Sequence, residues 1–126
     1  FVDAAPVLVL TTASLRTAAR HYPAGVWDPR RFRANVLVAV DHDGWVEDAW
    51  VGQPLTLGEV IVVPTEPCVR CTMVTRAQPG LEADVEIFRT LARKHGGLFG
   101  VWSDVAAAGR LSVGDRGSLP GPAVPA

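Results

Sequence analysis

The sequence predicts a single domain of the α+β or barrel-like class, in which many short strands accompany two helices. Its 126 residues have the length of one domain, and 48% apolar with 20% charged residues is enough to build a core. Short apolar runs separated by turn-forming residues outnumber the two segments with helical spacing, and no internal repeat is present. This pattern favours a mainly β domain over a parallel α/β sheet.

The N-terminal third begins with a strand and a helix. The run at 7–10, "VLVL", is short, half β-branched and preceded by Pro6, which is typical of a buried strand. A helix over about 13–21 follows, ending before Pro23. Its candidate N-caps are Thr11, Thr12 and Ser14, and capping is their expected role.

The middle of the chain is predicted to be β-rich. The expected strands cover residues 32–40, 54–57, 59–64 and 68–75, with turns at 41–44 and 78–80. Trp45 and Trp50 lie between the first two strands, and we expect them to pack in the core or at its edge.

The C-terminal part contains the strongest helix signal. In residues 84–95 the apolar positions recur at helical spacing, Asp84 stands at the start and Gly96 provides a stop. Closing strands are expected at 98–102 and 109–115. Residues 116–126 are rich in Gly and Pro without a period, so we predict a domain at 1–115 and a disordered tail at 116–126.

Composition excludes several function classes. A net charge of −1 gives no global attraction to nucleic acid or anionic lipid. No apolar run approaches the roughly 18 residues of a membrane span, and the start lacks the basic region of a signal peptide. The chain does not begin with Met, which suggests processing or a segment of a longer chain. We predict a cytoplasmic protein without a membrane span.

The two cysteines lie close together in "EPCVRCTMVT" and admit three interpretations. A zinc site would need more ligands than the unpaired histidines offer, and a redox pair normally lies at a helix N-terminus. Two buried structural cysteines are the third interpretation. If the segment is extended, Cys68 and Cys71 face opposite sides, so one thiolate can work alone while the other is packed.

Arginines supply the second chemical signal. Arg70 precedes Cys71, and "RRFRAN" concentrates three more arginines, with Asn35 two residues after Arg33. Guanidinium groups and amides of this kind suit a phosphate or another oxyanion, while a solvated charged loop is the alternative. A soft thiolate combined with an oxyanion clamp suggests a phosphate-bearing cofactor with a thiophilic metal.

These motifs, in this order, resemble those of the MOSC domain, the C-terminal module of molybdenum cofactor sulfurases. The likeness covers about residues 1–115 and is closest to the subfamily of amidoxime-reducing components and YcbX-like proteins. The matching segments are "FVDAAPVLVLTTASL", "RFRANVLV", "WVEDAWVGQPLTLGEV", "PCVRCTMVT", "FRTLARKH" and "LFGVW" followed by "GRLSVGD".

The resemblance implies a β-barrel of the pyruvate-kinase-barrel type and binding of the molybdenum cofactor, a molybdopterin that carries Mo. It implies Cys71 as the metal ligand and Asp3 as an acidic group near the metal. The implied cofactor contacts are Arg33, Asn35, Arg70 and Thr75. Family members carry a further β-rich N-terminal region, so we expect a barrel that lacks its N-terminal part. Ala34 stands where the family usually has Pro, which should loosen the loop without removing a ligand.

The function implied by the resemblance is that of a molybdenum-dependent oxidoreductase, or its cofactor half, that reduces N-oxygenated substrates. Its partners would be the molybdopterin cofactor and an electron-transfer protein or a fused redox domain. The alternative is a non-catalytic cofactor-binding or sulfur-carrier module, in which a cysteine persulfide relays sulfur. A third hypothesis is a barrel that serves only as a scaffold.

Overall fold

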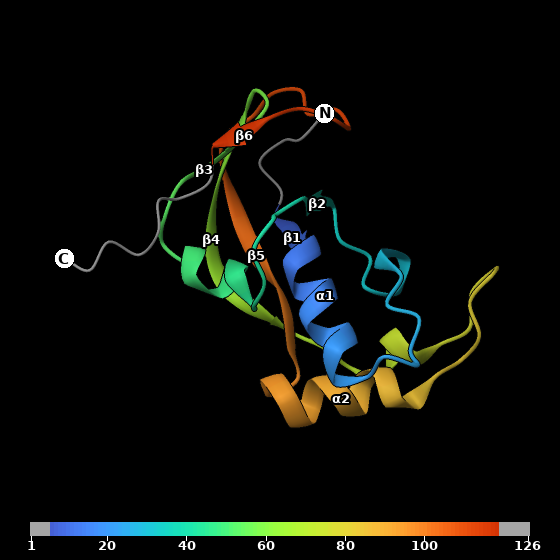
Figure 1. Ribbon diagram of the computed structural model, residues 1–126. Coiled ribbons are helices and arrows are strands. Elements are labelled where there is room, and N and C mark those ends of the chain that lie inside the picture. Colours follow the sequence, from blue (N-terminus) through green and yellow to red (C-terminus); the bar gives the residue numbers. More distant parts are fainter. Residues whose placement is uncertain (1–5, 119–126) are drawn as a thin grey trace.

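The fold is built on one mixed sheet of six strands, seen in a computed structural model that describes residues 6–118 (Figure 1). The spatial order of the strands is β2-β1-β5-β4-β3-β6. Only β1 and β2 pair in parallel, and all other neighbours are antiparallel. The strands are β1 (Val7–Thr11), β2 (Val36–Val38), β3 (Leu55–Leu57), β4 (Val60–Val69), β5 (Leu98–Ala107) and β6 (Gly117–Ser118).

The two long strands, β4 and β5, form the centre of the sheet and give it its curl. Their pairing shifts register at three places, between Ile61 and Val62, between Pro64 and Glu66, and between Pro67 and Val69. Register irregularities of this kind bend a strand and increase its twist, and they accommodate prolines in an interior strand. The resulting curled, mainly β sheet confirms the predicted barrel-like fold with two helices.

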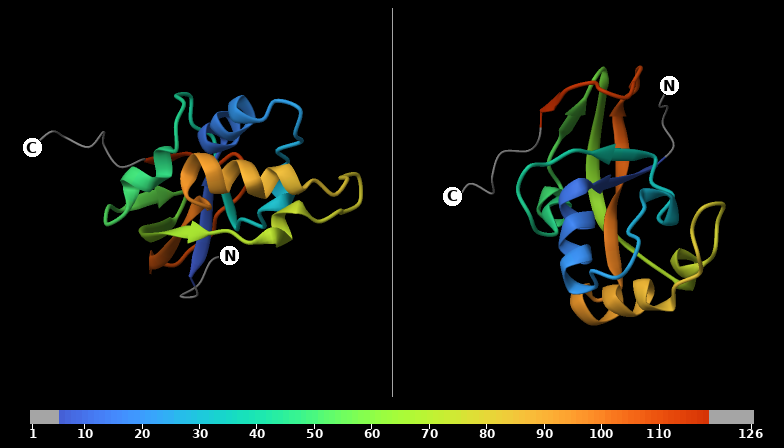
Figure 2. Two further views of the ribbon diagram at one scale, coloured as in Figure 1. Left: turned by 90° about the horizontal axis from the view of Figure 1, so that it is seen from below. Right: turned by 45° about the vertical axis from the view of Figure 1, so that its right-hand side comes forward.

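One helix lies beside the sheet, and the other crosses the lower end of the sheet (Figures 1 and 2). Helix α1 (Thr12–His21) begins at Thr11, whose hydroxyl accepts a hydrogen bond from the Ser14 amide at 3.0 Å. Helix α2 (Val85–His95) is capped by Asp84 and ends at Gly96, whose φ of 60° lies in the left-handed region. Of the three candidate caps of α1, Thr11 is confirmed, whereas Thr12 and Ser14 lie within the helix; the predicted cap Asp84 of α2 is also confirmed. Short polar side chains at these positions satisfy the free amides of a first helical turn.

Apolar side chains pack in two clusters. One lies within the curl of the sheet and contains Trp50, and the other lies beneath the helices around Phe32 and Phe99. The Phe32 and Phe99 rings are 4.6 Å apart between centroids, and both side chains are almost fully buried. Trp45 is half-buried and stacks on His95 at 4.3 Å, so the packing role expected for both tryptophans is confirmed.

Two predicted strands are wrong, and a third, expected at 32–40, is limited to β2 (Val36–Val38). Only the start of the segment 68–75 is β, because β4 ends at Val69 and the 3₁₀ helix η3 (Thr72–Thr75) follows. The segment 109–115 forms no strand, since β5 continues to Ala107 and the edge strand β6 begins at Gly117. Both errors arise because strand ends depend on the partner strand rather than on the local apolar pattern.

Two further 3₁₀ helices, η1 (Pro29–Arg31) and η2 (Val46–Trp50), lie in the connections on either side of β2. In η2, Glu47 is fully buried, and its carboxylate accepts hydrogen bonds from the Thr11 amide at 2.8 Å, the Thr11 hydroxyl and the Ser14 hydroxyl. Burial raises the pKa of Glu47 above its ordinary value, although the bonds from Ser14 and Thr11 oppose that shift. This carboxylate joins η2 to the start of α1.

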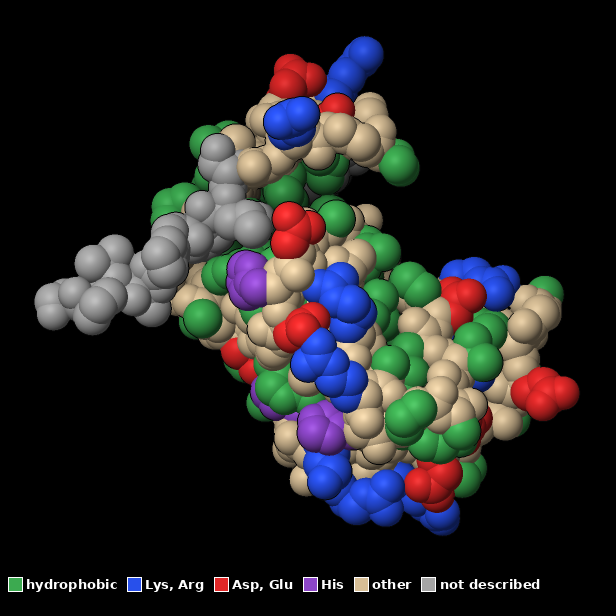
Figure 3. Space-filling view, viewed as in Figure 1, with side chains coloured by type: hydrophobic (Ala, Val, Ile, Leu, Met, Phe, Trp, Pro, Cys, Tyr) green, Lys and Arg blue, Asp and Glu red, His purple; other side chains and the backbone are tan. Residues whose placement is uncertain are grey.

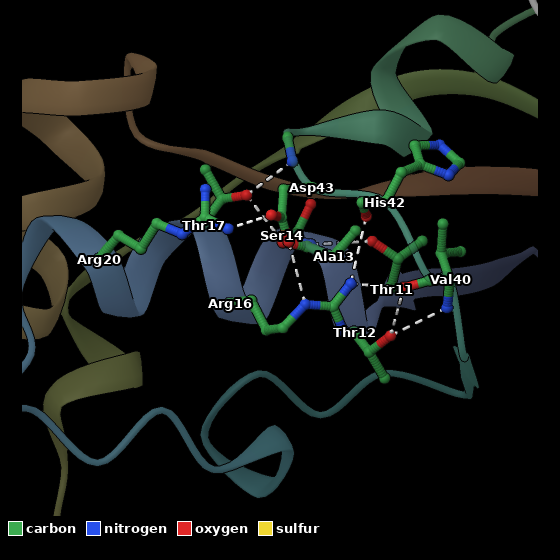
Figure 4. A network of polar contacts seen from close by, with 11 residues as sticks. Thr11, Thr12, Ala13, Ser14, Arg16, Thr17, Arg20, Val40, His42 and Asp43 are labelled. Carbon is green, nitrogen blue, oxygen red and sulfur yellow. Dashed lines mark hydrogen bonds and ion pairs between the residues drawn. The ribbon is translucent and has the colours of Figure 1, made fainter.

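The outer side of α1 is tied to the loop before η2 (Figure 4). Thr12 bonds both polar atoms of the Val40 backbone, Thr17 accepts from the Gly44 amide, and Arg16 and Arg20 share the Asp43 carboxylate.

In Figure 3 the Lys and Arg side chains form a band over α1 and gather again over α2 at the lower edge. Within residues 6–118, no helix is long and apolar enough to cross a membrane.

Candidate functional site

A groove of about 460 Å³ opens where β4 ends and brings together five separate parts of the chain. Its walls come from the start of β1, the end of η1 with the residues after it, the end of β4, the η3 region and one residue of β5. The lining residues are Leu8, Arg31, Phe32, Arg33, Cys68, Val69, Arg70, Cys71, Met73, Val74, Arg76, Ala77, Gln78 and Trp102. The volume lies within the range of small-molecule and cofactor sites.

Both cysteines border the groove, but their surroundings differ. Cys68 is a buried residue of β4, and burial raises the pKa of its thiol. Cys71 is exposed, carries a free thiol and stands immediately before η3. The two thiols are therefore not equivalent, and Cys71 is the one that a ligand in the groove reaches from solvent.

Arg70 lies between the two cysteines and is held by backbone oxygens. Its Nε donates to the Phe99 carbonyl at 2.9 Å and its Nη1 to the Phe32 carbonyl at 2.7 Å, with the guanidinium above the Phe32 ring. Burial lowers the pKa of Arg70 from its ordinary value. The remaining nitrogen, Nη2, is buried and has no hydrogen-bond partner in the described part of the chain. A buried donor without a partner is costly, so an acceptor supplied by a ligand would relieve that cost.

Gly100 leaves the room that this guanidinium occupies. Its φ is +81°, and a Cβ there would lie 3.0 Å from the Val9 carbonyl oxygen and 3.5 Å from Nη2 of Arg70. A side chain at this position would therefore be strained by the positive φ and crowded against the Val9 carbonyl oxygen, while its Cβ would lie in ordinary van der Waals contact with the arginine.

Arg33 lies on the segment between η1 and β2, and its backbone is unusual. It is exposed, and it is the only described residue other than glycine with a positive φ, 54°. Holding an L-residue in the left-handed region costs about 1–2 kcal/mol. Strain of this kind gathers at functional sites, where the position of a side chain matters more than stability.

The electrostatics of the groove are one-sided. Four arginines line it, at positions 31, 33, 70 and 76, and none of its lining residues is Asp or Glu. Arg31 is buried and holds loops, with Nε bonded to the Val26 carbonyl and Nη2 to the Glu82 carbonyl. A concave surface lined by one sign of charge attracts ligands of the opposite sign, so the groove suits an anionic ligand.

Of the residues predicted for a site, the structure brings Arg33, Arg70 and Cys71 together in this groove. Asn35 and Thr75 are not among its lining residues. The Asn35 side-chain oxygen accepts from the Leu8 amide at 2.7 Å, and the Thr75 hydroxyl closes the η3 turn on the Thr72 carbonyl at 2.6 Å. Asp3 lies outside the described residues.

Sequence reasoning did not select Arg31 or Arg76 as site residues. Arg31 was visible in "RRFRAN", but nothing in the sequence distinguishes a buried arginine from its exposed neighbours. Arg76 follows the cysteine motif directly, and only the turn of η3 places it on the groove wall.

The groove does not contain a complete set of metal ligands. Among residues 6–118 no group of three or more His, Cys, Asp or Glu side chains could hold a metal ion. Within the described lining, Cys71 is the exposed thiol that could serve as a soft ligand. A single accessible thiol, an unpartnered arginine nitrogen and an acid-free wall fit a metal-bearing cofactor with a phosphate.

The fold and the groove define a class: a barrel-like β domain whose thiol-bearing groove is lined by arginines. A family model for the MOSC domain matches residues 1–117. The chain belongs to the MOSC domain family, which is associated with the molybdenum cofactor. A search among curated proteins found no match.

Proposed function

We propose that the groove binds the molybdenum cofactor, with Cys71 as the one protein ligand to molybdenum. The observation that carries the proposal is the exposed Cys71 thiol beside the buried, unpartnered Nη2 of Arg70, in a groove with no carboxylate among its described lining. A thiolate is a soft ligand, and guanidinium groups bind phosphate through paired hydrogen bonds.

The arginines would hold the anionic part of the cofactor. Arg70 is fixed by two carbonyls, so its third nitrogen is already oriented before a ligand arrives. Arg33 is exposed and makes no ion pair within the described residues, so its guanidinium group is free to bind a phosphate. Asn35 and Thr75 would act indirectly, by holding β1 against the segment of Arg33 and by shaping the η3 turn after Cys71.

The reaction we propose is the reduction of an N-oxygenated substrate, as in the amidoxime-reducing subfamily that the motifs resemble. Bound molybdenum would supply oxygen-atom transfer coupled to electron transfer. Reduction of an N-hydroxyl group consumes two electrons and two protons and releases water, and an electron-transfer protein or a fused redox domain would supply the electrons. Asp3, which the resemblance places near the metal, is the proposed acidic group. The described groove walls offer no carboxylate or histidine, so solvent would be the other proton source.

A carrier without turnover is the second candidate function. The same accessible Cys71 thiol could hold a persulfide, which is the observation that favours a sulfur carrier as the alternative. Both functions depend on Cys71, but they differ in whether electron donors produce turnover. We place the protein in the cytoplasm, as the sequence predicts.

The test is the molybdenum and pterin content of protein purified from a cofactor-competent host. We expect both in the wild type, loss of molybdenum in Cys71→Ala, and retention in Cys68→Ala, because the Cys71 residue is exposed whereas Cys68 is buried. Equal molybdenum content in the two variants would rule out the ligand assignment. Turnover of an amidoxime with an electron donor, or persulfide labelling at Cys71 without turnover, then separates the two functions.

A further inference from the structure

Arg76 is a feature of the groove that the proposed cofactor contacts leave unused. It is exposed, lines the groove and follows η3 directly. Within residues 6–118 its guanidinium takes part in no ion pair, whereas the nearby Arg30 is paired with Asp28 at 3.1 Å. The side chain therefore presents a free guanidinium to the groove.

The loop that carries Arg76 is anchored, although the side chain is free. Gln78 and Leu81 exchange two backbone hydrogen bonds, at 2.9 and 2.8 Å. Arg30 reaches across from η1 to the Pro79 carbonyl at 2.9 Å, and the Gln78 side chain returns a bond to the Arg30 carbonyl. Anchoring the loop fixes the backbone from which the Arg76 side chain extends, so less loop entropy is lost when the side chain binds a ligand.

The geometry of η3 relates Arg76 to Cys71. The 3₁₀ helix covers the four residues between them, and the Val74 and Arg76 amides close its turns. At about 2 Å of rise per residue, the two Cα atoms are about 10 Å apart. A long arginine side chain at that distance can contact a molecule bound next to the Cys71 sulfur.

Apolar side chains surround this position. Val69, Met73 and Trp102 line the groove with 75%, 46% and 39% of their surface exposed. Exposed apolar groups beside a free guanidinium suit a molecule with an apolar body and one negatively charged end.

We propose that Arg76 binds the oxyanion of the substrate, a carboxylate or phosphate. The apolar remainder of the substrate then packs against Val69, Met73 and Trp102, beside Cys71. The substrate class is thus an amphipathic organic anion. The statement that this ligand is a substrate rests on the proposed function, whereas the presence of an anion subsite next to Cys71 does not. The alternative source of the oxyanion is the cofactor's own phosphate.

The first experiment measures alkylation of Cys71 in cofactor-free protein, with the modified residue identified by peptide mass spectrometry. The probes are iodoacetate, which is anionic, and iodoacetamide, which is neutral. We expect Arg76→Gln to lower the iodoacetate-to-iodoacetamide rate ratio about three- to fivefold, as for loss of a unit charge several Å from the sulfur in near-aqueous surroundings. Lys94→Gln on α2, which makes the same charge change away from the groove, and Arg76→Lys should keep the ratio. An unchanged ratio in Arg76→Gln would overturn the proposal.

Protection by small ligands tests the substrate class in the same assay. Benzoate should slow the reaction of Cys71 with iodoacetamide in the wild type, and benzamide, its neutral counterpart, should protect less. Arg76→Gln should abolish the difference between them. Equal protection by the two compounds in the wild type would remove the anionic requirement and sink the assignment.

Cofactor content separates the two sources of the oxyanion. In protein from a cofactor-competent host, Arg76→Gln should retain wild-type molybdenum and pterin, while Arg33→Gln should lose them. Loss in both variants would assign the oxyanion to the cofactor phosphate and overturn the proposal. Absence of cofactor from the wild type would refute the proposed function and, with it, the substrate assignment, while the alkylation ratio would still decide whether an anion subsite exists.

Discussion

The start of α1 and the groove at the end of β4 are both rich in polar groups, but they differ in whether the buried polar groups have hydrogen-bond partners. Around α1, buried Glu47 accepts bonds from the Thr11 amide and from two hydroxyls, and Thr12 and Thr17 bond the backbone of the following loop. In the groove, Arg70 has a buried nitrogen without a partner in the described structure. The hydrogen-bonded polar groups at the start of α1 stabilise the fold. The unpartnered nitrogen in the groove leaves a donor available to a ligand.

The backbone shows the same contrast. The N-cap of α1 and the C-cap of α2 use residues suited to their backbone conformation, namely Thr11 in an extended conformation and Gly96 in a left-handed one. In the groove, Arg33 has a φ of 54°, where glycine would be favoured. A strained arginine in the same groove as an exposed thiol supports the binding role that we propose for this groove.

The largest predicted effect is at Glu47. Truncation in Glu47→Ala should lower the free energy of unfolding by about 3 kcal/mol, because it leaves the buried Thr11 amide without an acceptor and opens a cavity. Glu59→Ala, at an exposed position, should change it by less than about 0.5 kcal/mol. Urea denaturation of both variants makes the comparison, and similar losses would contradict a special role for the buried carboxylate.

Two of the four groove arginines, Arg70 and Arg76, provide a second, smaller test. Arg70→Lys should lower the free energy of unfolding by about 2 kcal/mol, because a lysine cannot reach both the Phe99 and Phe32 carbonyls. Arg76→Lys should leave stability unchanged within about 0.5 kcal/mol, since Arg76 is exposed. Thermal or chemical denaturation measures both, and equal effects would mean that Arg70 is not a structural element of the groove.

Glu47 also predicts a pH dependence. Its pKa is raised in the folded protein from an ordinary value of 4.5, so between these values the folded state holds more protons than the unfolded state. This contribution to stability is fully present below pH 4.5 and is lost as the pH rises through the raised pKa. Urea denaturation at a series of pH values should therefore show a decline that Glu47→Gln flattens, and parallel profiles would refute the raised pKa.

The smallest effect concerns the strain at Arg33. Arg33→Gly should increase the free energy of unfolding by about 0.5–1 kcal/mol, because glycine adopts positive φ without a steric cost. Arg33→Ala removes the same guanidinium but keeps the strain, so it should give no gain. Both variants should lose cofactor if Arg33 binds it. A gain in Arg33→Ala equal to that in Arg33→Gly would show that charge, not backbone strain, is responsible.

Much of the fold was predictable because its signals are local. The caps Thr11 and Asp84, the stop at Gly96 and the first strand all follow from short-range geometry that neighbouring residues impose. The segment 68–75 was not predictable in this way. Its apolar pattern suits a strand, but pairing with β5 ends at Val69 and the chain then turns into η3.

The sequence by itself determined the family, the two capped helices and the candidate importance of Arg33, Arg70 and Cys71, because ordered motifs and caps are written in consecutive residues. The structure confirmed that one cysteine is packed, Cys68, while the other, Cys71, is exposed. Only the tertiary structure decided that Glu47 lies beneath α1 and that Arg76 borders the same groove as Cys71. Burial and satisfaction of a polar group depend on partners far away in the chain. The distance of 36 residues between Thr11 and Glu47 is the clearest instance.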